Sequence, residues 1–391
     1  MRGLLVSTAA LAAVFMPLAA AGQEAPPPVS SSVLTWTFEQ QKANYPAMEK
    51  VAAHKVVKRG ASVFPLPAGT PIDPTFDIAG TRHTVASYME AHRASGVLVI
   101  KDGKIILERY GLGRTETDRW TSFSVAKSVT STLVGAAVKD GFIKSLDDPV
   151  SAYVPEMKGS AYDEVTVRHL ITMSSGVKWN EDYTDMKSDV AQVGLSILEP
   201  GVNPVVSYMR RLPRAEPAGT KFRYSTGETD LAGIVVSKAV GKPLADYLSE
   251  KIWAPFGMEQ DAIWVEDVAG HERGGCCMSM TLRDYGRVGM FLLGGGEASG
   301  RKVLPDGWVQ EATRSHIAVN PAVPAAGGYG YFWWINTSGG YEASGIFGQS
   351  ITTYPKENLV IVVNSAWPTA TGREVNATHD AFVEALRVAA R

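Results

Sequence analysis

The chain has 391 residues, of which 45% are hydrophobic and 20% charged, the composition of an ordinary soluble globular protein. This length allows two domains, or one large domain with an insertion. The formal net charge is −2 and no Lys/Arg-rich run occurs, so the sequence argues against nucleic acid as a partner.

The N-terminal residues have the pattern of a secretory signal peptide. Arg2 precedes an apolar run over residues 4–20, and residues 19–21 are the small residues that a cleavage site needs. The run is short for a membrane span and contains Pro17, and no cysteine follows it. We therefore expect residues 1–21 to be removed, leaving a periplasmic or secreted protein without a stable membrane anchor.

The first half of the mature chain predicts an extension, a helix and a hairpin. Residues 22–83 are rich in Pro and Ala and are expected to wrap the surface, and residues 84–93 predict a short helix. Apolar runs over residues 96–100 and 105–110 flank an Asp-Gly turn, the strongest local signal for a β-hairpin.

The remaining segments predict a helical insertion and a return of strands. Residues 146–299 have a helical pattern, with helices expected at 166–173, 229–240, 244–253 and 281–293. Strands are expected at 329–335, 348–354 and 359–364, and a closing helix at 381–390. The predicted fold class is α/β (α+β). Residues 84–145 and 300–391 would build one antiparallel sheet flanked by helices, and residues 146–299 a mainly helical domain.

Ser124 and Lys127 lie near the start of a predicted apolar helix over residues 120–141. Residues three apart share one face of a helix, so the lysine amine can lie beside the serine hydroxyl. A desolvated lysine can activate a serine by taking its proton. To do so near neutral pH, its pKa must fall from about 10.4, which corresponds to about 4 kcal/mol of preference for the neutral amine.

Two further segments carry candidate site residues. Tyr224 follows an aromatic-polar run and precedes a predicted helix. The Gly-flanked strand start at residues 343–349 lets a ligand approach the backbone N–H groups closely.

The order Ser-x-x-Lys, Tyr-x-x and (Ser/Thr)-Gly resembles the penicillin-recognising serine hydrolases, which include class C β-lactamases and family VIII carboxylesterases. Short sequence segments at residues 147–150, 169–176, 217–220 and 281–284 support the resemblance. Within that group the chain is most similar to 6-aminohexanoate-dimer hydrolases, through its segments at 179–185, 333–334, 345–349 and 365–368.

The resemblance implies a role for each candidate residue. Ser124 would be the nucleophile and Lys127 with Tyr224 the proton-transfer pair, and the sequence leaves open which of the two is the kinetic base. The resemblance further implies an oxyanion hole from the Ser124 and Ile346 N–H groups, and substrate contacts from the following residues: Tyr183, Trp334, Ser344 and Gly345.

Two departures from the β-lactamase pattern shift the expected substrate. Thr226 stands where Tyr-x-Asn usually has its asparagine, and Ala343 stands where a Lys or His usually meets a substrate carboxylate. The sequence therefore favours an exported hydrolase of a small-molecule ester or linear amide over a β-lactamase or D-Ala-D-Ala carboxypeptidase. A non-catalytic penicillin-binding-like sensor is the alternative from another class.

Other chemistries lack support. No metal-binding histidine motif and no glycine-rich cofactor motif occurs, so neither a metal nor a cofactor is expected, and His169 and His379 are assigned no role. Adjacent cysteines cannot staple a fold, so Cys276 and Cys277 are expected to be two small buried residues. The oligomeric state is not fixed by the sequence.

Overall fold

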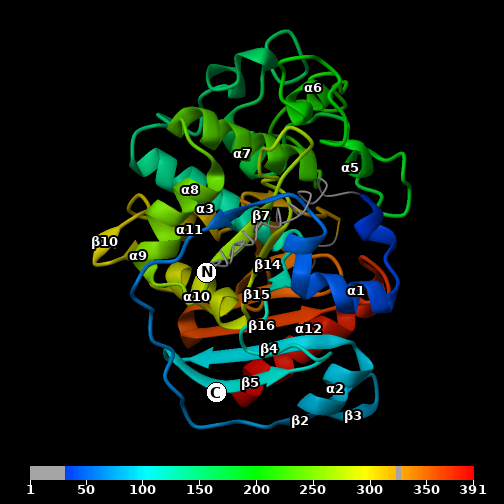
Figure 1. Cartoon of the computed structure of the whole chain (residues 1–391), viewed down its shortest axis with the longest axis vertical. Helices are drawn as coiled ribbons and strands as arrows, with labels where there is room; N and C mark the ends of the chain where they lie inside the picture. The colour runs from blue at the N-terminus through cyan, green and yellow to red at the C-terminus, as the bar shows by residue number, and fades with distance from the viewer. Residues whose placement is uncertain (1–30, 323–326) are drawn as a thin grey trace, which may run out of the picture.

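The computed structural model describes residues 31–322 and 327–391, so the expected signal peptide lies outside the described residues. An antiparallel sheet of eight strands, in the order β11-β12-β13-β14-β15-β16-β4-β5, occupies one half of the molecule and a largely helical region the other (Figure 1). The sheet draws its strands from both ends of the chain, which confirms the predicted fold class. Among the described residues, no helix is both long and apolar enough to cross a bilayer.

The elements of the main sheet are β4 (Ala94–Lys101), β5 (Lys104–Tyr110), β11 (Ile317–Ala318), β12 (Gly328–Tyr329), β13 (Trp334–Ile335), β14 (Tyr341–Gly345), β15 (Gln349–Tyr354) and β16 (Leu359–Ser365). The remaining strands are β1 (His54–Val57), β2 (Thr75–Ile78), β3 (Thr81–Thr84), β6 (Trp120–Thr121), β7 (Ala262–Val265), β8 (Met278–Met280), β9 (Glu297–Ala298) and β10 (Arg301–Lys302).

The α-helices are α1 (Phe38–Asn44), α2 (Val85–Ala91), α3 (Val125–Lys139), α4 (Val167–Ile171), α5 (Asp189–Gln192), α6 (Pro204–Met209), α7 (Thr226–Val240), α8 (Leu244–Leu248), α9 (Ala254–Phe256), α10 (Leu282–Leu293), α11 (Trp308–Ala312) and α12 (Arg373–Ala389). Shorter helical turns are η1 (Ser31–Thr35), η2 (Tyr45–Lys50), η3 (Val150–Ala152), η4 (Pro155–Met157), η5 (Ser249–Trp253) and η7 (Pro355–Glu357).

The predicted hairpin is confirmed as β4 and β5. Its turn residues Asp102 and Gly103 both have positive φ, 52° and 74°, as a tight two-residue hairpin turn requires. On its other edge β4 pairs with β16, with Val97 opposite Val363, which joins the two ends of the chain in one sheet.

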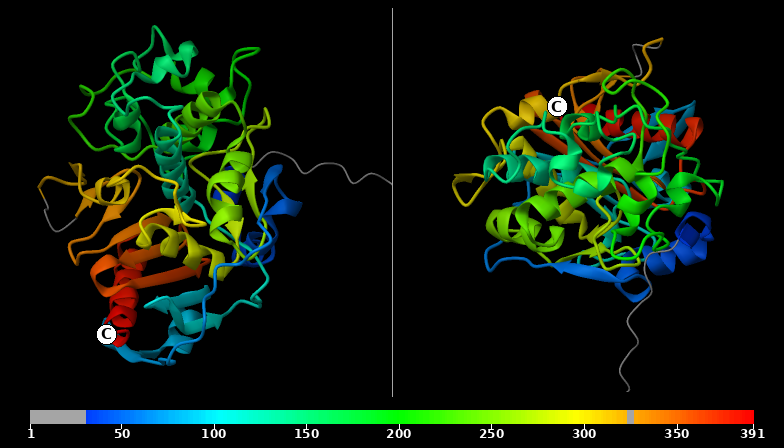
Figure 2. Two further views of the ribbon diagram at one scale, coloured as in Figure 1. Left: turned by 90° about the vertical axis from the view of Figure 1, so that its left-hand side faces the viewer. Right: turned by 90° about the horizontal axis from the view of Figure 1, so that it is seen from above.

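Both faces of the sheet are covered. Leu98 and Val362 pack in a cluster shared with α3 and α10, whereas Val97 and Val363 pack in a second cluster with α2 and α12. Successive strand residues point to opposite faces, so burial on both sides explains the continuous apolar runs of the sequence. Figure 2 shows the helical region above the sheet and the C-terminal helix below it.

A second sheet, in the order β1-β7-β8-β6, adds short strands to residues 146–299, for which a mainly helical domain was predicted. Strands β7 and β8 are short, and β7 pairs with β1 from the N-terminal extension, with Val265 opposite His54. The spacing of apolar residues cannot predict strands this short, because their pairing partners lie far away in the sequence. Strand β6 of this sheet leads directly into the segment that carries Ser124.

The N-terminal extension does more than wrap the surface. Val33, Tyr45 and Met48 are buried and pack with Trp120 and Phe123 in a third core cluster. The extension therefore supports the segment that precedes Ser124.

Two C-terminal elements differ from the prediction. The strand expected at residues 329–335 is split into β12 and β13, because Phe332 between them has a φ of 58°, which a strand cannot accommodate. Helix α12 begins at Arg373, before the predicted start at residue 381. The prediction missed its first two turns because residues 373–380 are mostly polar and lack the apolar spacing that signals a helix.

Candidate active site

Ser124 occupies the N-cap position of α3, without a capping hydrogen bond from its side chain, and follows a strained residue. Phe123 has a φ of 43°, in the left-handed region that a bulky side chain rarely adopts. Its ring packs against Tyr45 and Phe347, with centroids 5.3 Å away in each case. Aromatic packing therefore holds the turn that presents the Ser124 hydroxyl.

Lys127 lies one turn along α3, and the structure brings its amine to Ser124. Its Nζ is 3.0 Å from Ser124 Oγ, 3.0 Å from Thr226 Oγ1 and 2.7 Å from the Gly275 carbonyl oxygen. A neutral amine has two N–H groups and one lone pair, so it can donate to Thr226 and Gly275 and accept the proton of Ser124.

The surroundings of Lys127 favour the neutral amine. Its side chain is 1% exposed, and this burial lowers the pKa to about 8, whereas the charges of Glu181 and Asp230 act to raise it. The fall from the ordinary pKa corresponds to roughly 3 kcal/mol in favour of the neutral form. At pH 7 about one tenth of the molecules then carry a neutral Lys127.

Tyr224 lies two residues before the start of α7 and completes the predicted trio. Its ring stacks on Trp334 at 5.6 Å and 21°, and Lys127 Nζ lies 5.1 Å from the ring centroid. Burial raises the pKa of Tyr224 well above its usual value, and a hydrogen bond with the Ser124 hydroxyl offsets part of this rise. The phenol is therefore protonated and beside the serine.

Glu181 is a half-buried partner that the sequence did not point to. It accepts hydrogen bonds from the Thr226 backbone N–H at 3.0 Å, from the Thr226 hydroxyl, and from the Tyr183 hydroxyl at 2.8 Å. The hydroxyl of Thr226 accepts from Lys127, so a chain of hydrogen bonds joins Lys127 to Glu181. Glu181 lies two residues before Tyr183 in the segment at residues 179–185. This proximity to a candidate site residue was the sequence signal that could have identified Glu181.

Two backbone N–H groups near the Ser124 hydroxyl have no hydrogen-bond acceptor among the described residues. Within the described residues, neither the Ser124 N–H nor the Ile346 N–H has a hydrogen-bond acceptor. Gly345 lets β14 approach closely, because a Cβ there would lie 2.5 Å from the Ser122 carbonyl oxygen and 3.1 Å from the Ser124 nitrogen. The two N–H groups therefore lie where β14 meets the turn that carries Ser124.

One cavity of about 610 Å³ collects the predicted residues. Lys127 lies behind Ser124, and the other seven predicted residues line the cavity wall: Ser124, Tyr183, Tyr224, Trp334, Ser344, Gly345 and Ile346. Ala343 instead points into the core and is 1% exposed, and the cavity-facing neighbour before it is Glu342. His379, to which the sequence assigned no role, also lines this cavity.

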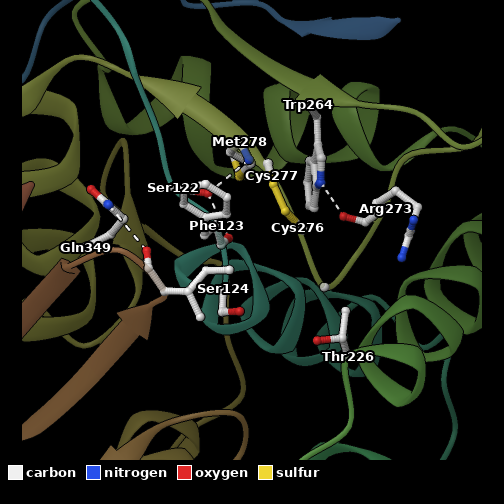
Figure 3. The surroundings of a disulfide bond; sticks show 12 residues. Ser122, Phe123, Ser124, Thr226, Trp264, Arg273, Cys276, Cys277, Met278 and Gln349 are labelled. Carbon is white, nitrogen blue, oxygen red and sulfur yellow. Dashed lines mark hydrogen bonds between the residues drawn. A yellow bond between two sulfur atoms is a disulfide. The ribbon is translucent and has the colours of Figure 1, made fainter. Parts of the chain in front are cut away.

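The sequence predicted two small buried residues at positions 276 and 277 and left their oxidation state open. Cys276 and Cys277 form a disulfide, drawn in Figure 3 with Ser124, Phe123 and Thr226. Cys277 is buried, whereas Cys276 lines a smaller cavity of about 70 Å³ that also reaches Ser124. Because the two residues are adjacent, this disulfide links no distant parts of the chain. Over the described ranges, no group of three or more His, Cys, Asp or Glu could hold a metal ion.

Comparison with known proteins agrees with the fold and the motifs. A family model described as Beta-lactamase matches residues 81–385. The chain is 32% identical over 316 residues to the 6-aminohexanoate-dimer hydrolase of Paenarthrobacter ureafaciens, covering 76% of this chain and 80% of that protein.

Solved structures share the architecture. A Bacillus anthracis protein assigned as a 6-aminohexanoate-dimer hydrolase superposes with a TM-score of 0.80 at 23% identity, covering 90% of this chain and 94% of that one. The class C β-lactamase of Rhodobacter sphaeroides superposes with a TM-score of 0.54 at 19% identity, covering 77% and 97%. The resemblance expected from the sequence motifs is confirmed.

Proposed function

The chain belongs to the β-lactamase family of serine hydrolases, and from this premise we propose that it cleaves an ester or small linear amide through an acyl-enzyme on Ser124. The observation that carries the proposal is the contact of 3.0 Å between Lys127 Nζ and Ser124 Oγ, made by a lysine whose burial lowers its pKa to about 8. Similarity to a hydrolase of a linear amide supports the substrate class.

Acylation begins when neutral Lys127 takes the proton of Ser124 while Oγ bonds to the substrate carbonyl carbon. Negative charge then develops on the carbonyl oxygen, where the N–H groups of Ser124 and Ile346 would each contribute about 3 kcal/mol. The tetrahedral intermediate collapses as Tyr224 gives its proton to the leaving group, and Lys127 returns a proton to Tyr224.

Deacylation uses the same groups in reverse. A water molecule attacks the acyl carbon as it loses its proton to neutral Lys127, directly or through Tyr224, which passes its own proton to Lys127. The bond to Ser124 Oγ then breaks as Lys127 returns this proton to Oγ. Tyr183 faces the same cavity and donates to Glu181, so it is placed to contact the substrate beside Tyr224.

The lining of the cavity argues against a β-lactam substrate. No described Lys or Arg side chain lines it, and Ala343, at the position of the usual cation, points into the core. A carboxylate-bearing substrate would therefore enter a cavity without a paired positive charge.

The decisive variant is Ser124→Ala, which removes the nucleophile and leaves the packing unchanged. We expect hydrolysis of p-nitrophenyl butyrate to fall at least a thousandfold, with an unchanged melting temperature and circular dichroism spectrum. Treatment of the wild type with a fluorophosphonate should add mass to the peptide containing Ser124. Near-wild-type hydrolysis by the folded variant would refute the proposal, and parallel assays with nitrocefin and a linear 6-aminohexanoate dimer rank the substrate classes.

A further inference from the structure

The last part of the connection from β7 to β8, residues 273–277, contacts the amine of Lys127. The Gly275 carbonyl oxygen lies 2.7 Å from Lys127 Nζ, closer than the other two partners of this amine. A neutral amine has two N–H groups and one lone pair in a tetrahedral arrangement. When the N–H groups point to Gly275 and Thr226, the lone pair is left for the proton of Ser124. The position of the Gly275 carbonyl therefore decides where this lone pair points.

Asp230 of α7 binds this segment at two points. Its Oδ1 accepts the Gly275 backbone N–H at 2.8 Å. Its Oδ2 accepts Arg273 Nε at 2.8 Å and lies 2.6 Å from Arg273 Nη2, in an ion pair whose side chains are 1% and 8% exposed. The Arg273 carbonyl in turn accepts a hydrogen bond from Trp264 Nε1 at 2.8 Å (Figure 3). Gly275 is thus held through both of its backbone groups, the N–H by Asp230 and the carbonyl by Lys127.

Two glycines let the segment lie directly on α7. A Cβ at Gly274 would stand 2.6 Å from the Thr229 carbonyl oxygen. A Cβ at Gly275 would stand 2.8 Å from the Thr226 carbonyl oxygen. The Gly274 carbonyl also accepts a hydrogen bond from the Thr130 hydroxyl of α3 at 2.7 Å. Contacts this close leave the segment no slack, so moving the carboxylate that binds it would also move its carbonyl groups.

Charged or titratable side chains face Lys127 from each segment packed around it. Burial is the main cause of its lowered pKa, while the charges of Glu181 and Asp230 act to raise the pKa and that of Arg273 acts to lower it further. The ring centroid of Tyr224 lies 5.1 Å from Lys127 Nζ. Because Asp230 and Arg273 have opposite electrostatic effects on Lys127, these effects partly cancel. The hydrogen bond from Gly275 to Asp230 is then the more important link between this ion pair and the amine.

We propose that Asp230 is a positioning residue for Lys127. It holds the Gly275 carbonyl where it accepts one N–H group of the neutral amine, which keeps the lone pair directed at Ser124. Asp230 is not among the described residues that line the cavity of about 610 Å³, so it acts through Gly275 and not by touching the substrate. The inference rests on the proposed function, in which Lys127 takes the proton of Ser124.

The first test variant is Asp230→Asn. An amide can accept from the Gly275 N–H or from Arg273, but its NH2 group then faces the other donor, so one contact is lost. We expect kcat for p-nitrophenyl butyrate, measured from pH 6 to 10, to fall at least tenfold on its high-pH plateau, with KM changed less than twofold. The midpoint should also move to lower pH, because a negative charge near Lys127 is gone. Loss of charge alone would move the midpoint and leave the plateau unchanged.

Asp230→Glu separates geometry from charge, and it also serves if Asp230→Asn does not fold. It keeps the negative charge, but its extra methylene does not fit a side chain that is 1% exposed, so the carboxylate and the Gly275 carbonyl must shift. We expect the plateau of kcat to fall at least fivefold while the midpoint of the pH profile stays in place. Reaction of Ser124 with a fluorophosphonate, followed by mass spectrometry, should slow by a similar factor.

Asp284→Asn is the matched control. Asp284 is also fully buried, pairs with Arg287 at 3.0 Å and accepts a backbone N–H, from Glu259 at 2.7 Å. Its substitution should lower the melting temperature, as loss of a buried ion pair does, and leave the plateau of kcat and the midpoint at their wild-type values.

Each outcome bears on one proposal. A wild-type plateau of kcat in folded Asp230→Asn or Asp230→Glu would overturn the positioning role and leave the hydrolase intact. A plateau that falls as far in Asp284→Asn would indicate a general loosening of the fold and also overturn it. A wild type that neither cleaves the ester nor reacts with the fluorophosphonate would instead overturn the proposed function.

Discussion

At the scale of single residues, Lys127 is the group whose protonation should govern activity. A protonated amine cannot take the proton of Ser124, and burial sets the pKa of Lys127 at about 8. The folded-state pKa is lowered, so the active neutral form grows as pH rises through this value.

We therefore expect kcat/KM for p-nitrophenyl butyrate to rise about tenfold per pH unit below 8 and to level off above it. Tyr224 should add no descending limb below pH 10, because burial raises its pKa. Initial rates from pH 6 to 10, corrected for spontaneous hydrolysis, give the profile. A flat profile would remove Lys127 from the role of base.

Glu181 offers a second test at this scale, because its charge acts on Lys127. The carboxylate raises the pKa of Lys127 through space, against the larger effect of burial. In Glu181→Gln that contribution disappears, so the midpoint of the pH profile should move to lower pH while the amide keeps hydrogen-bond contact with Thr226.

The matched control is Asp182→Asn, which removes a charge from the exposed neighbouring residue. It should leave the midpoint unchanged when its pH profile is measured in the same buffers. A midpoint that moves to higher pH in Glu181→Gln, or that stays in place, would contradict the assigned coupling.

At the scale of elements, the proposed oxyanion hole depends on two backbone segments held by aromatic packing. Phe123 precedes Ser124 and Phe347 follows Ile346, and both have positive φ, 43° and 60°. Their rings lie 5.3 Å apart, and Tyr45 from η2 of the N-terminal extension contacts both. The extension thus stabilises the geometry of both N–H donors.

Tyr45→Leu removes this aromatic contact without touching the cavity. We expect kcat to fall about tenfold with little change in KM, because the donors act mainly on the charge of the transition state. Tyr88→Leu serves as the comparison, since Tyr88 is equally buried in the cluster beneath the sheet and far from Ser124 in the fold. If both variants lose stability alike but Tyr45→Leu keeps its kcat, the packing has no role in positioning the donors.

Elements with local signals were the ones that the sequence could predict. The Asp102–Gly103 turn fixes the hairpin, and the apolar spacing of α3 fixes the helix that carries Lys127. Strands β7 and β8 were missed because their pairing to β1 and β6 is decided by distant residues.

The same distinction holds for the site. Ser124, Lys127 and Tyr224 could be proposed from the sequence because each stands in a recognisable short motif. Glu342 and Asp380 carry no such pattern, and both line the cavity only because the fold places β14 and α12 at its wall. A group of residues contributed by two elements that are distant in sequence can be recognised only from the tertiary structure.

At the scale of the whole molecule, the sheet and the helical region share one core. Leu98 and Ile351 of the sheet belong to the same buried cluster as Leu231 of α7, and α3 joins them by packing against both β14 and α7. The sequence suggested two domains, yet a continuous core predicts that the chain unfolds as one unit. The site, which lies where these regions meet, would then be lost in the same step.

Calorimetry should therefore show a single transition in which the calorimetric and van't Hoff enthalpies agree. Leu231→Ala and Ile351→Ala each remove buried methyl groups, from the helical region and the sheet respectively, at a cost of about 2–5 kcal/mol. Each variant should lower the same melting temperature, and hydrolytic activity should disappear at that temperature. Two resolved transitions, with each variant moving only one of them, would show that the regions unfold independently despite their shared core.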